Sequence, residues 1–141
     1  MRNAPLMGAR AQALGILADA LITSSALRAR ITAEHFLGAL DSTPAKLRVE
    51  SDLYHADVAI WLAFMESLPD TWSSVMAFGH NPGLTELAAD VWDLPVNNVP
   101  TCGVLCLTFT GPTWKETATR QPVTALFDYP KNSSNLPEVL R

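Results

Sequence analysis

The stretch from Ser74 to Gly83, Ser-Val-Met-Ala-Phe-Gly-His-Asn-Pro-Gly, decides the fold of this 141-residue chain. Its first five residues form a short apolar run that predicts a buried strand. Beyond the turn, helical spacing links Leu84, Leu87, Ala88 and Val91, with Asn81 predicted as the N-cap and Pro82 as the first helical residue. The turn therefore places the imidazole of His80 where α/β proteins bind anions and carry out catalysis.

Local physics leaves two interpretations of this turn open. In the first, His80 belongs to an anion-binding or catalytic site at the start of the helix. In the second, glycine, asparagine and proline punctuate an ordinary strand-to-helix turn, and His80 has no chemical role. Other parts of the sequence are needed to distinguish these two interpretations of the turn.

The composition predicts a globular protein, with 48% hydrophobic and 17% charged residues. The chain is long enough for one domain with a sizeable core. Its net charge is -4 and it has no basic cluster, which argues against a nucleic-acid partner. It contains no apolar run of bilayer length and no signal-peptide core, so we expect no membrane partner and a cytoplasmic protein.

The two cysteines, Cys102 and Cys106, are predicted to be buried thiols. On one strand they would share a face but lie too far apart for a disulfide. No paired histidines accompany them at ligand spacing, so no zinc site is predicted. Thiols of this kind fit a reducing cytoplasm.

A second segment, from Ser24 to Glu34, also carries chemistry. The preceding residues Ala20–Thr23 predict a strand, and Ser24 or Ser25 is expected to cap the helix that follows. Arg28 falls in the first turn of that helix, where a cation opposes the helix dipole. An anion held between Arg28 and the helix start would resolve this conflict, because the guanidinium matches phosphate oxygens bidentately. The alternative is a solvated surface arginine.

Strands alternating with helices predict an α/β fold with a mostly parallel sheet and helices on both faces. We expect one domain over residues 1–129 and a loose tail over 130–141. His35 and His55 are assigned to structural or solvated positions. The further elements predicted are helices at 5–17 and 58–68, a loop at 41–46, an extended segment at 47–54, a strand at 101–110 with its return strand at 114–119, and a last extended piece at 123–129.

The two segments, in this order, resemble the histidine phosphatase superfamily, and above all its small SixA-type phosphohistidine phosphatases. The Gly79–Gly83 turn resembles the family's second-histidine motif. Ser24–Glu34 resembles its Ser-Ser-(Pro)-x-Leu-Arg-Ala-x-x-Thr-Ala segment, whose arginine binds the phosphoryl group. Weaker likeness extends through Leu53–Ala56, Pro100-Thr101 and Trp114. The resemblance implies a phosphoglycerate mutase-like fold.

In that family a neutral histidine attacks phosphorus, and a second histidine and two arginines hold the equatorial oxygens. Arg28 and His80 match the second arginine and the second histidine, so they are the expected catalytic residues and, with Asn81, the expected phosphate-binding residues. Arginine and histidine supply the charge, so neither a metal nor a cofactor is expected. The nucleophile lies in an Arg-His-Gly motif on the first strand, and no Arg-His pair occurs here. We therefore expect an N-terminally incomplete fold.

Three hypotheses follow. The chain is a phosphohistidine or phosphoprotein phosphatase whose first strand is missing, a non-catalytic relative that binds phosphate or a partner protein, or an unrelated α/β domain. In either of the first two cases, loss of an interior strand should expose sheet edges and favour a homodimer.

Overall fold

The structure is a computed structural model, and it describes residues 3–40, 47–134 and 136–141. The chain divides into two compact units. The first unit comprises Met1–Ala56 and Thr71–His80, and the second comprises Asp57–Asp70 and Asn81–Arg141. The predicted boundary between residues 129 and 130 does not separate them, because the second unit continues to the last residue.

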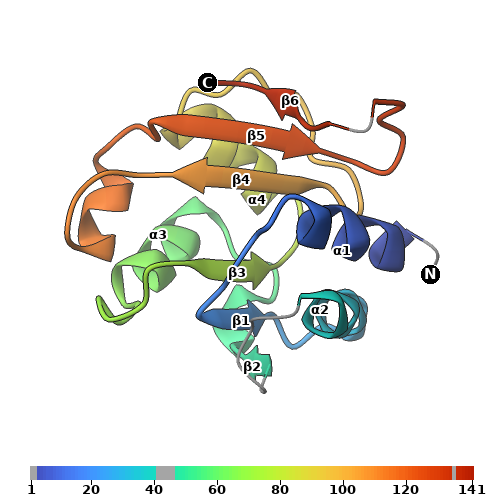
Figure 1. Cartoon of the computed structure of the whole chain (residues 1–141). Coiled ribbons are helices and arrows are strands. Elements are labelled where there is room, and N and C mark those ends of the chain that lie inside the picture. The colour runs from blue at the N-terminus through green and yellow to red at the C-terminus, as the bar shows by residue number, and fades with distance from the viewer. Residues whose placement is uncertain (1–2, 41–46, 135) are drawn as a thin grey trace. The chain divides into compact units, whose positions relative to one another are not determined.

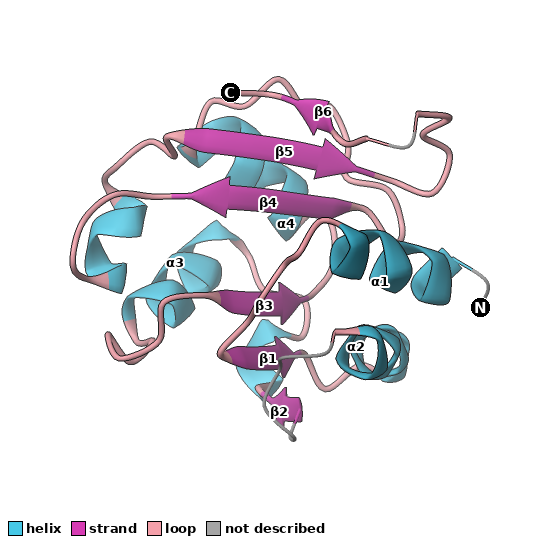
Figure 2. Ribbon diagram, viewed as in Figure 1, coloured by secondary structure: helices cyan, strands magenta, loops and turns pink. Residues whose placement is uncertain are grey.

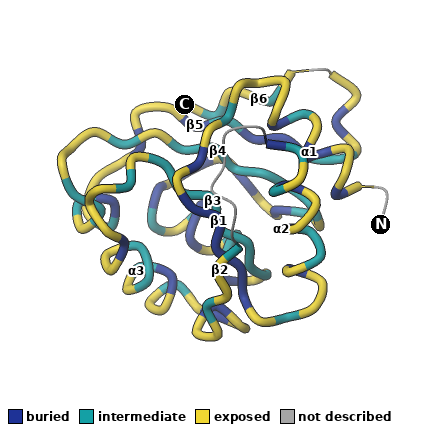
Figure 3. Tube along the Cα trace, turned by 60° about the horizontal axis from the view of Figure 1, so that its bottom comes forward, coloured by how far each residue is buried: buried dark blue, intermediate teal, exposed yellow. Residues whose placement is uncertain are grey.

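The first unit contains a parallel sheet with the strand order β2-β1-β3 (Figure 1). All four residues of β1 are buried, so this central strand forms the core of the unit (Figure 3). Helix α2 contacts all three strands and also packs against α1. The elements are α1 (Asn3–Ala13), β1 (Ala20–Thr23), α2 (Leu27–Ala39), β2 (Leu47–Val49), a 3-10 turn (Ser51–Leu53) and β3 (Val75–Phe78).

The second unit contains an antiparallel sheet with the strand order β4-β5-β6 (Figure 2). Helix α3 packs against the 3-10 helix that follows β4 and, less extensively, against α4. The elements are α3 (Val58–Glu66), α4 (Gly83–Glu86) continued by a π-helical turn (Leu87–Val91), β4 (Val104–Thr108), a 3-10 helix (Trp114–Ala118), β5 (Thr124–Asp128) and β6 (Glu138–Val139).

The mixed α/β class is confirmed, and so is a parallel sheet. Strand β1 has its predicted bounds, and β3 lies within the predicted run. Helix α3 begins after Asp57, whose Oδ1 accepts a hydrogen bond from the Ile60 N–H at 3.0 Å. The extended segment predicted at 47–54 contains β2 and the 3-10 turn, while the loop predicted at 41–46 lies outside the described residues.

The predicted return strand at 114–119 is wrong, because these residues form a 3-10 helix. Trp114 forms two hydrogen bonds with residues 69 and 70, which follow α3. Its backbone N–H donates to Asp70 Oδ1 at 3.0 Å, and its indole Nε1 donates to the Pro69 carbonyl at 3.1 Å. These contacts hold the segment away from β4. The partner of β4 is instead β5, in the extended piece predicted at 123–129.

The predicted loose tail is also wrong, because residues 138–139 form β6 against β5. Asn132 is buried, and its side-chain amide donates to Asp128 Oδ1 at 2.9 Å and to the Leu136 carbonyl at 3.1 Å. The polar composition of the tail suggested solvation, but the Asn132 amide is satisfied by a carboxylate of β5 and by a backbone carbonyl of the tail. The prediction for the two cysteines differs from the structure as well. Cys102 lies in the turn before β4, so it does not share a strand with Cys106, and both residues are partly exposed instead of buried.

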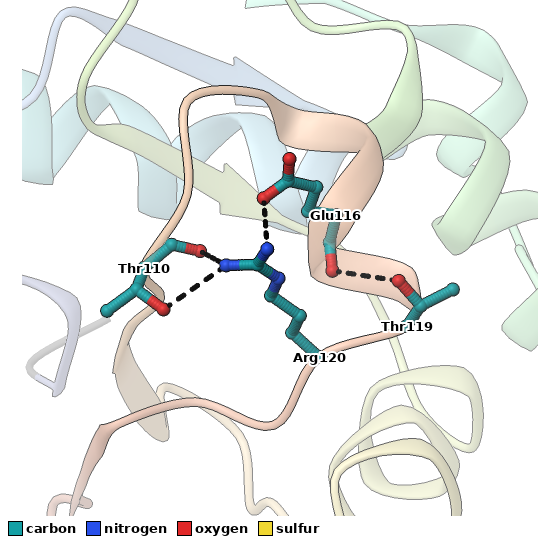
Figure 4. Close-up of polar contacts among 4 residues, drawn as sticks. All are labelled: Thr110, Glu116, Thr119 and Arg120. Atoms are coloured by element: carbon teal, nitrogen blue, oxygen red, sulfur yellow. Dashed lines mark hydrogen bonds and ion pairs between the residues drawn. The ribbon is translucent and has the colours of Figure 1, made fainter.

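Gly111 lies in the connection that leaves β4, with a φ of 118°, a region that favours glycine. Arg120 closes this connection (Figure 4): its guanidinium donates to the Thr110 carbonyl at 3.1 Å and pairs with Glu116 at 3.2 Å. A Cβ atom at position 111 would overlap Glu116 Oε2, so that carboxylate would have to shift.

We predict that Gly111→Ala lowers the free energy of unfolding by about 1–3 kcal/mol, because the backbone conformation is strained for any residue with a Cβ. Urea denaturation followed by circular dichroism measures the change. Gly38→Ala is the matched control, since Gly38 lies in α2 with open space around the added methyl group. Alanine there should be neutral or stabilising. Equal stability of Gly111→Ala and the unsubstituted chain would contradict the prediction.

Candidate functional site

The site lies at the carboxyl ends of β1 and β3. These parallel strands pair in a register that sets Thr23 beside Phe78. The next residues therefore leave the sheet at the same edge, and the Ser24 N–H continues the ladder by donating to the Phe78 carbonyl at 3.0 Å. As a result, Ser24 and His80, which are 56 residues apart in sequence, meet at this edge.

The contact between them joins Ser24 Oγ to His80 Nε2 at 2.7 Å. Ser24 is fully buried, whereas His80 is half-buried. The Ala26 N–H also donates to Ser24 Oγ, at 3.3 Å. Ser24 or Ser25 was the expected cap of α2, but the helix begins at Leu27 after Ala26 and has no side-chain cap. Ser24 is held by β3 and the imidazole instead.

Arg28 occupies the first turn of α2, as predicted. Its side chain is exposed, and the first turn contains no acidic residue. Among the described residues, none forms an ion pair or hydrogen bond with the Arg28 guanidinium. The helix therefore begins with an unbalanced cation and without a capping side chain, two features that both favour a bound anion.

Three surroundings lower the pKa of His80 below its usual value of 6.5. Burial contributes most, followed by the positive charges of His55 and Arg28. The influence of Arg28 on this pKa indicates that the guanidinium and the imidazole share one electrostatic environment. A lowered pKa favours the neutral imidazole at pH 7.

Two neighbours of His80 were not predicted. The ring centroids of Tyr54 and His55 each lie 6.0 Å from that of His80, and those of Tyr54 and His55 lie 4.3 Å apart. His55, which was predicted to be structural or solvated, has a φ of 53° in the left-handed region. The only sequence signal was its place in the Leu53–Ala56 segment, because local periodicity carries no information on contacts with residue 80.

Asn81 has a structural task in the second unit. Its Oδ1 accepts from the Thr85 N–H at 3.2 Å and from Thr85 Oγ1 at 2.7 Å. Its amide nitrogen donates to Asn98 Oδ1 and to the Val99 carbonyl. The residue thus binds the first turn of α4, as expected of a cap, although Pro82 is the boundary residue and the helix begins at Gly83. These contacts occupy the side chain that was expected to bind phosphate.

The described residues include no group of three or more histidine, cysteine, aspartate or glutamate side chains able to hold a metal ion. Among the same residues, no helix combines the length and the apolar character needed to cross a membrane. The polar groups of the site are therefore the hydroxyl of Ser24, the imidazoles of His55 and His80, the phenol of Tyr54 and the guanidinium of Arg28. Such a set can bind an anion by charge and hydrogen bonds.

No family model matches the chain, and no curated protein matches it either. Several solved structures share its fold, and three of them are described below. A SixA protein of Nakamurella multipartitia, named as a phosphohistidine phosphatase, is 21% identical with a TM-score of 0.78, over 92% of this chain and 81% of that one. The protein histidine phosphatase SixA complexed with tungstate is 19% identical with a TM-score of 0.59, over 98% of this chain and 76% of that one.

The third structure is a SixA protein of Agrobacterium tumefaciens, also named as a phosphohistidine phosphatase. It is 21% identical with a TM-score of 0.57, over 64% of this chain and 56% of that chain. At these identities the likeness concerns the fold and not the chemistry. The chain therefore has the fold of the SixA phosphohistidine phosphatases, the histidine phosphatase fold.

Proposed function

We propose that this chain is a phosphohistidine phosphatase-like protein that binds a phosphoryl group between Arg28 and His80. The observation that carries the proposal is the unbalanced charge of Arg28 at the uncapped start of α2, electrostatically coupled to an imidazole that Ser24 holds. A phosphoryl group would neutralise the guanidinium and accept hydrogen bonds from the helix start. The ligand would be a phosphorylated substrate, such as a phosphohistidine protein.

The start of α2 supplies the donors that this proposal requires. The first turn of a helix leaves N–H groups without intrahelical partners. In α2 the Ala26 N–H binds Ser24 Oγ, while no described residue accepts from the N–H groups of Leu27, Arg28 or Ala29. Tungstate, bound in one of the SixA structures, is a tetrahedral oxyanion like phosphate. This likeness supports an oxyanion as the ligand.

Turnover is a separate matter from binding. The sequence has three histidines, at positions 35, 55 and 80, and none follows an arginine as the family's attacking histidine does. Arg28 and His80 can stabilise charge on a transferring phosphoryl group, but neither matches the nucleophile. The alternative function is therefore a non-catalytic protein that binds phosphate or a phosphorylated partner. We infer a cytoplasmic role without nucleic-acid or membrane partners.

We further propose that the chain forms a homodimer through a sheet edge. Among the described strands, β3 pairs only with β1, and β4 pairs only with β5. The residues of β3 are apolar and partly exposed, as are Val104, Leu105 and Leu107 of β4. Each strand thus offers unpaired backbone groups beside apolar side chains, which favours pairing with a second copy.

Arg28→Gln should weaken binding of phosphate about tenfold or more, because it removes a charge-assisted, bidentate contact. Isothermal titration calorimetry at pH 7 measures the dissociation constant. Arg30→Gln removes the same charge two residues further along α2 and should leave phosphate binding nearly unchanged. Equal losses in both variants would reduce the effect to net charge and overturn the assigned site.

The 141-residue chain should hydrolyse phosphohistidine or aryl phosphates feebly or not at all, because binding groups alone cannot replace a covalent nucleophile. Release of inorganic phosphate, compared with that of the His80→Ala variant, measures the activity. Robust turnover that disappears in His80→Ala, with no histidine-linked phosphate trapped, would make His80 a base or nucleophile in its own right.

Light scattering coupled to size exclusion should give a mass near twice the 15.3 kDa of the chain at micromolar concentration. Met76→Lys places a charge on β3, the kind of residue that blocks edge pairing, and should shift the mass toward that of the monomer. The control is Val139→Lys, on β6 in the other sheet, where valine is 75% exposed. A monomer that is stable to heat and dilution would contradict the proposed dimer.

A further inference from the structure

The hydroxyl of Ser24 has two contacts that must share one proton and two lone pairs. The Ala26 N–H donates to Oγ at 3.3 Å, which uses one lone pair. The contact to His80 Nε2 at 2.7 Å uses either the hydroxyl proton or the second lone pair. Which of these it uses depends on the tautomer of the imidazole.

In one tautomer His80 carries its proton on Nε2 and donates it to Ser24 Oγ. The hydroxyl would then accept two hydrogen bonds, and its own proton would need another acceptor. Ser24 is fully buried, and among the described residues none other than His80 contacts its Oγ as an acceptor. A buried donor without a partner is costly, so this tautomer is disfavoured.

In the other tautomer the Ser24 hydroxyl donates to an unprotonated Nε2, and the proton of the imidazole is on Nδ1. The hydroxyl is then fully satisfied, because Oγ accepts from the Ala26 N–H and donates its proton to His80 Nε2. The Nδ1–H belongs to a half-buried side chain and is left for solvent or a ligand. The backbone of Ser24 is fixed as well, because its N–H binds the Phe78 carbonyl at 3.0 Å and its carbonyl accepts from Thr23 Oγ1 at 3.0 Å. The hydroxyl therefore has little freedom to turn elsewhere.

We propose that Ser24 is a positioning residue that fixes neutral His80 as the Nδ1–H tautomer, so that His80 offers a hydrogen-bond donor to a bound oxyanion. This inference rests on the proposed function and deepens it, since it assigns the atom through which His80 acts. With Nδ1 protonated and Nε2 engaged by the hydroxyl, neither nitrogen has an available lone pair. His80 then stabilises charge and does not attack phosphorus.

Long-range nitrogen–proton NMR on the ligand-free, 15N-labelled chain identifies the tautomer above the titration midpoint of His80. We expect the Nδ1–H form in the unsubstituted chain and a shift toward the Nε2–H form, which free histidine prefers, in Ser24→Ala. Ser24→Thr keeps the hydroxyl and should keep the Nδ1–H form. Ser25→Ala is the control, because Ser25 is exposed. An Nε2–H tautomer in the unsubstituted chain overturns the inference without any variant having to fold.

Binding of sulfate, a dianion between pH 5 and 8, separates positioning from a merely structural effect. Above the His80 midpoint, Ser24→Ala should weaken sulfate binding roughly two- to tenfold, the effect of one lost hydrogen bond. Below that midpoint both ring nitrogens carry protons, so the difference should vanish. A loss that persists at both pH values would make Ser24 structural only and overturn the inference. Failure of sulfate to bind, with the Nδ1–H tautomer present, would refute the proposed function alone.

Discussion

The parallel pairing of β1 with β3 is the constraint on which the candidate site depends. Its register places Thr23 beside Phe78, and one further hydrogen bond extends the ladder to Ser24. Parallel strands end at the same edge of a sheet. The turn after β1 therefore places Ser24 and the start of α2 beside His80, which lies in the turn after β3. A slip of one residue in this register would turn the side chains of β3 to the opposite face and move the turn that carries His80.

The electrostatics of the site follow from this arrangement. His80 is half-buried beside two potential cations, and each of these surroundings lowers its pKa. Positive charge is thereby concentrated on Arg28, because a guanidinium keeps its charge at physiological pH. A permanent cation beside a neutral imidazole suits an oxyanion, because the guanidinium provides charge and the imidazole provides a directed hydrogen bond.

Much of this could be predicted from the sequence, for physical reasons that differ between residues. The β1 and β3 runs are short, apolar and bounded by turn residues, so their local signal was strong enough to place both strands. Residues 114–119 alternate in the manner of a strand, yet contacts of Trp114 with Pro69 and Asp70 override that pattern. The approach of His55 to His80 and the burial of Asn132 depend on tertiary contacts. The periodicity of hydrophobic residues along the sequence does not predict such contacts.

The fold and the candidate site are separate kinds of evidence for the function. A fold shared at 19–21% identity can hold many chemistries, so the SixA-like architecture does not by itself assign a ligand. Arg28 is a different kind of evidence, because a cation in the first turn of an uncapped helix is unfavourable in the unliganded chain. Among the described residues none offsets that cost with a carboxylate. An oxyanion would satisfy the guanidinium and the helix N–H groups together, which makes the local instability itself the strongest physical argument for a ligand.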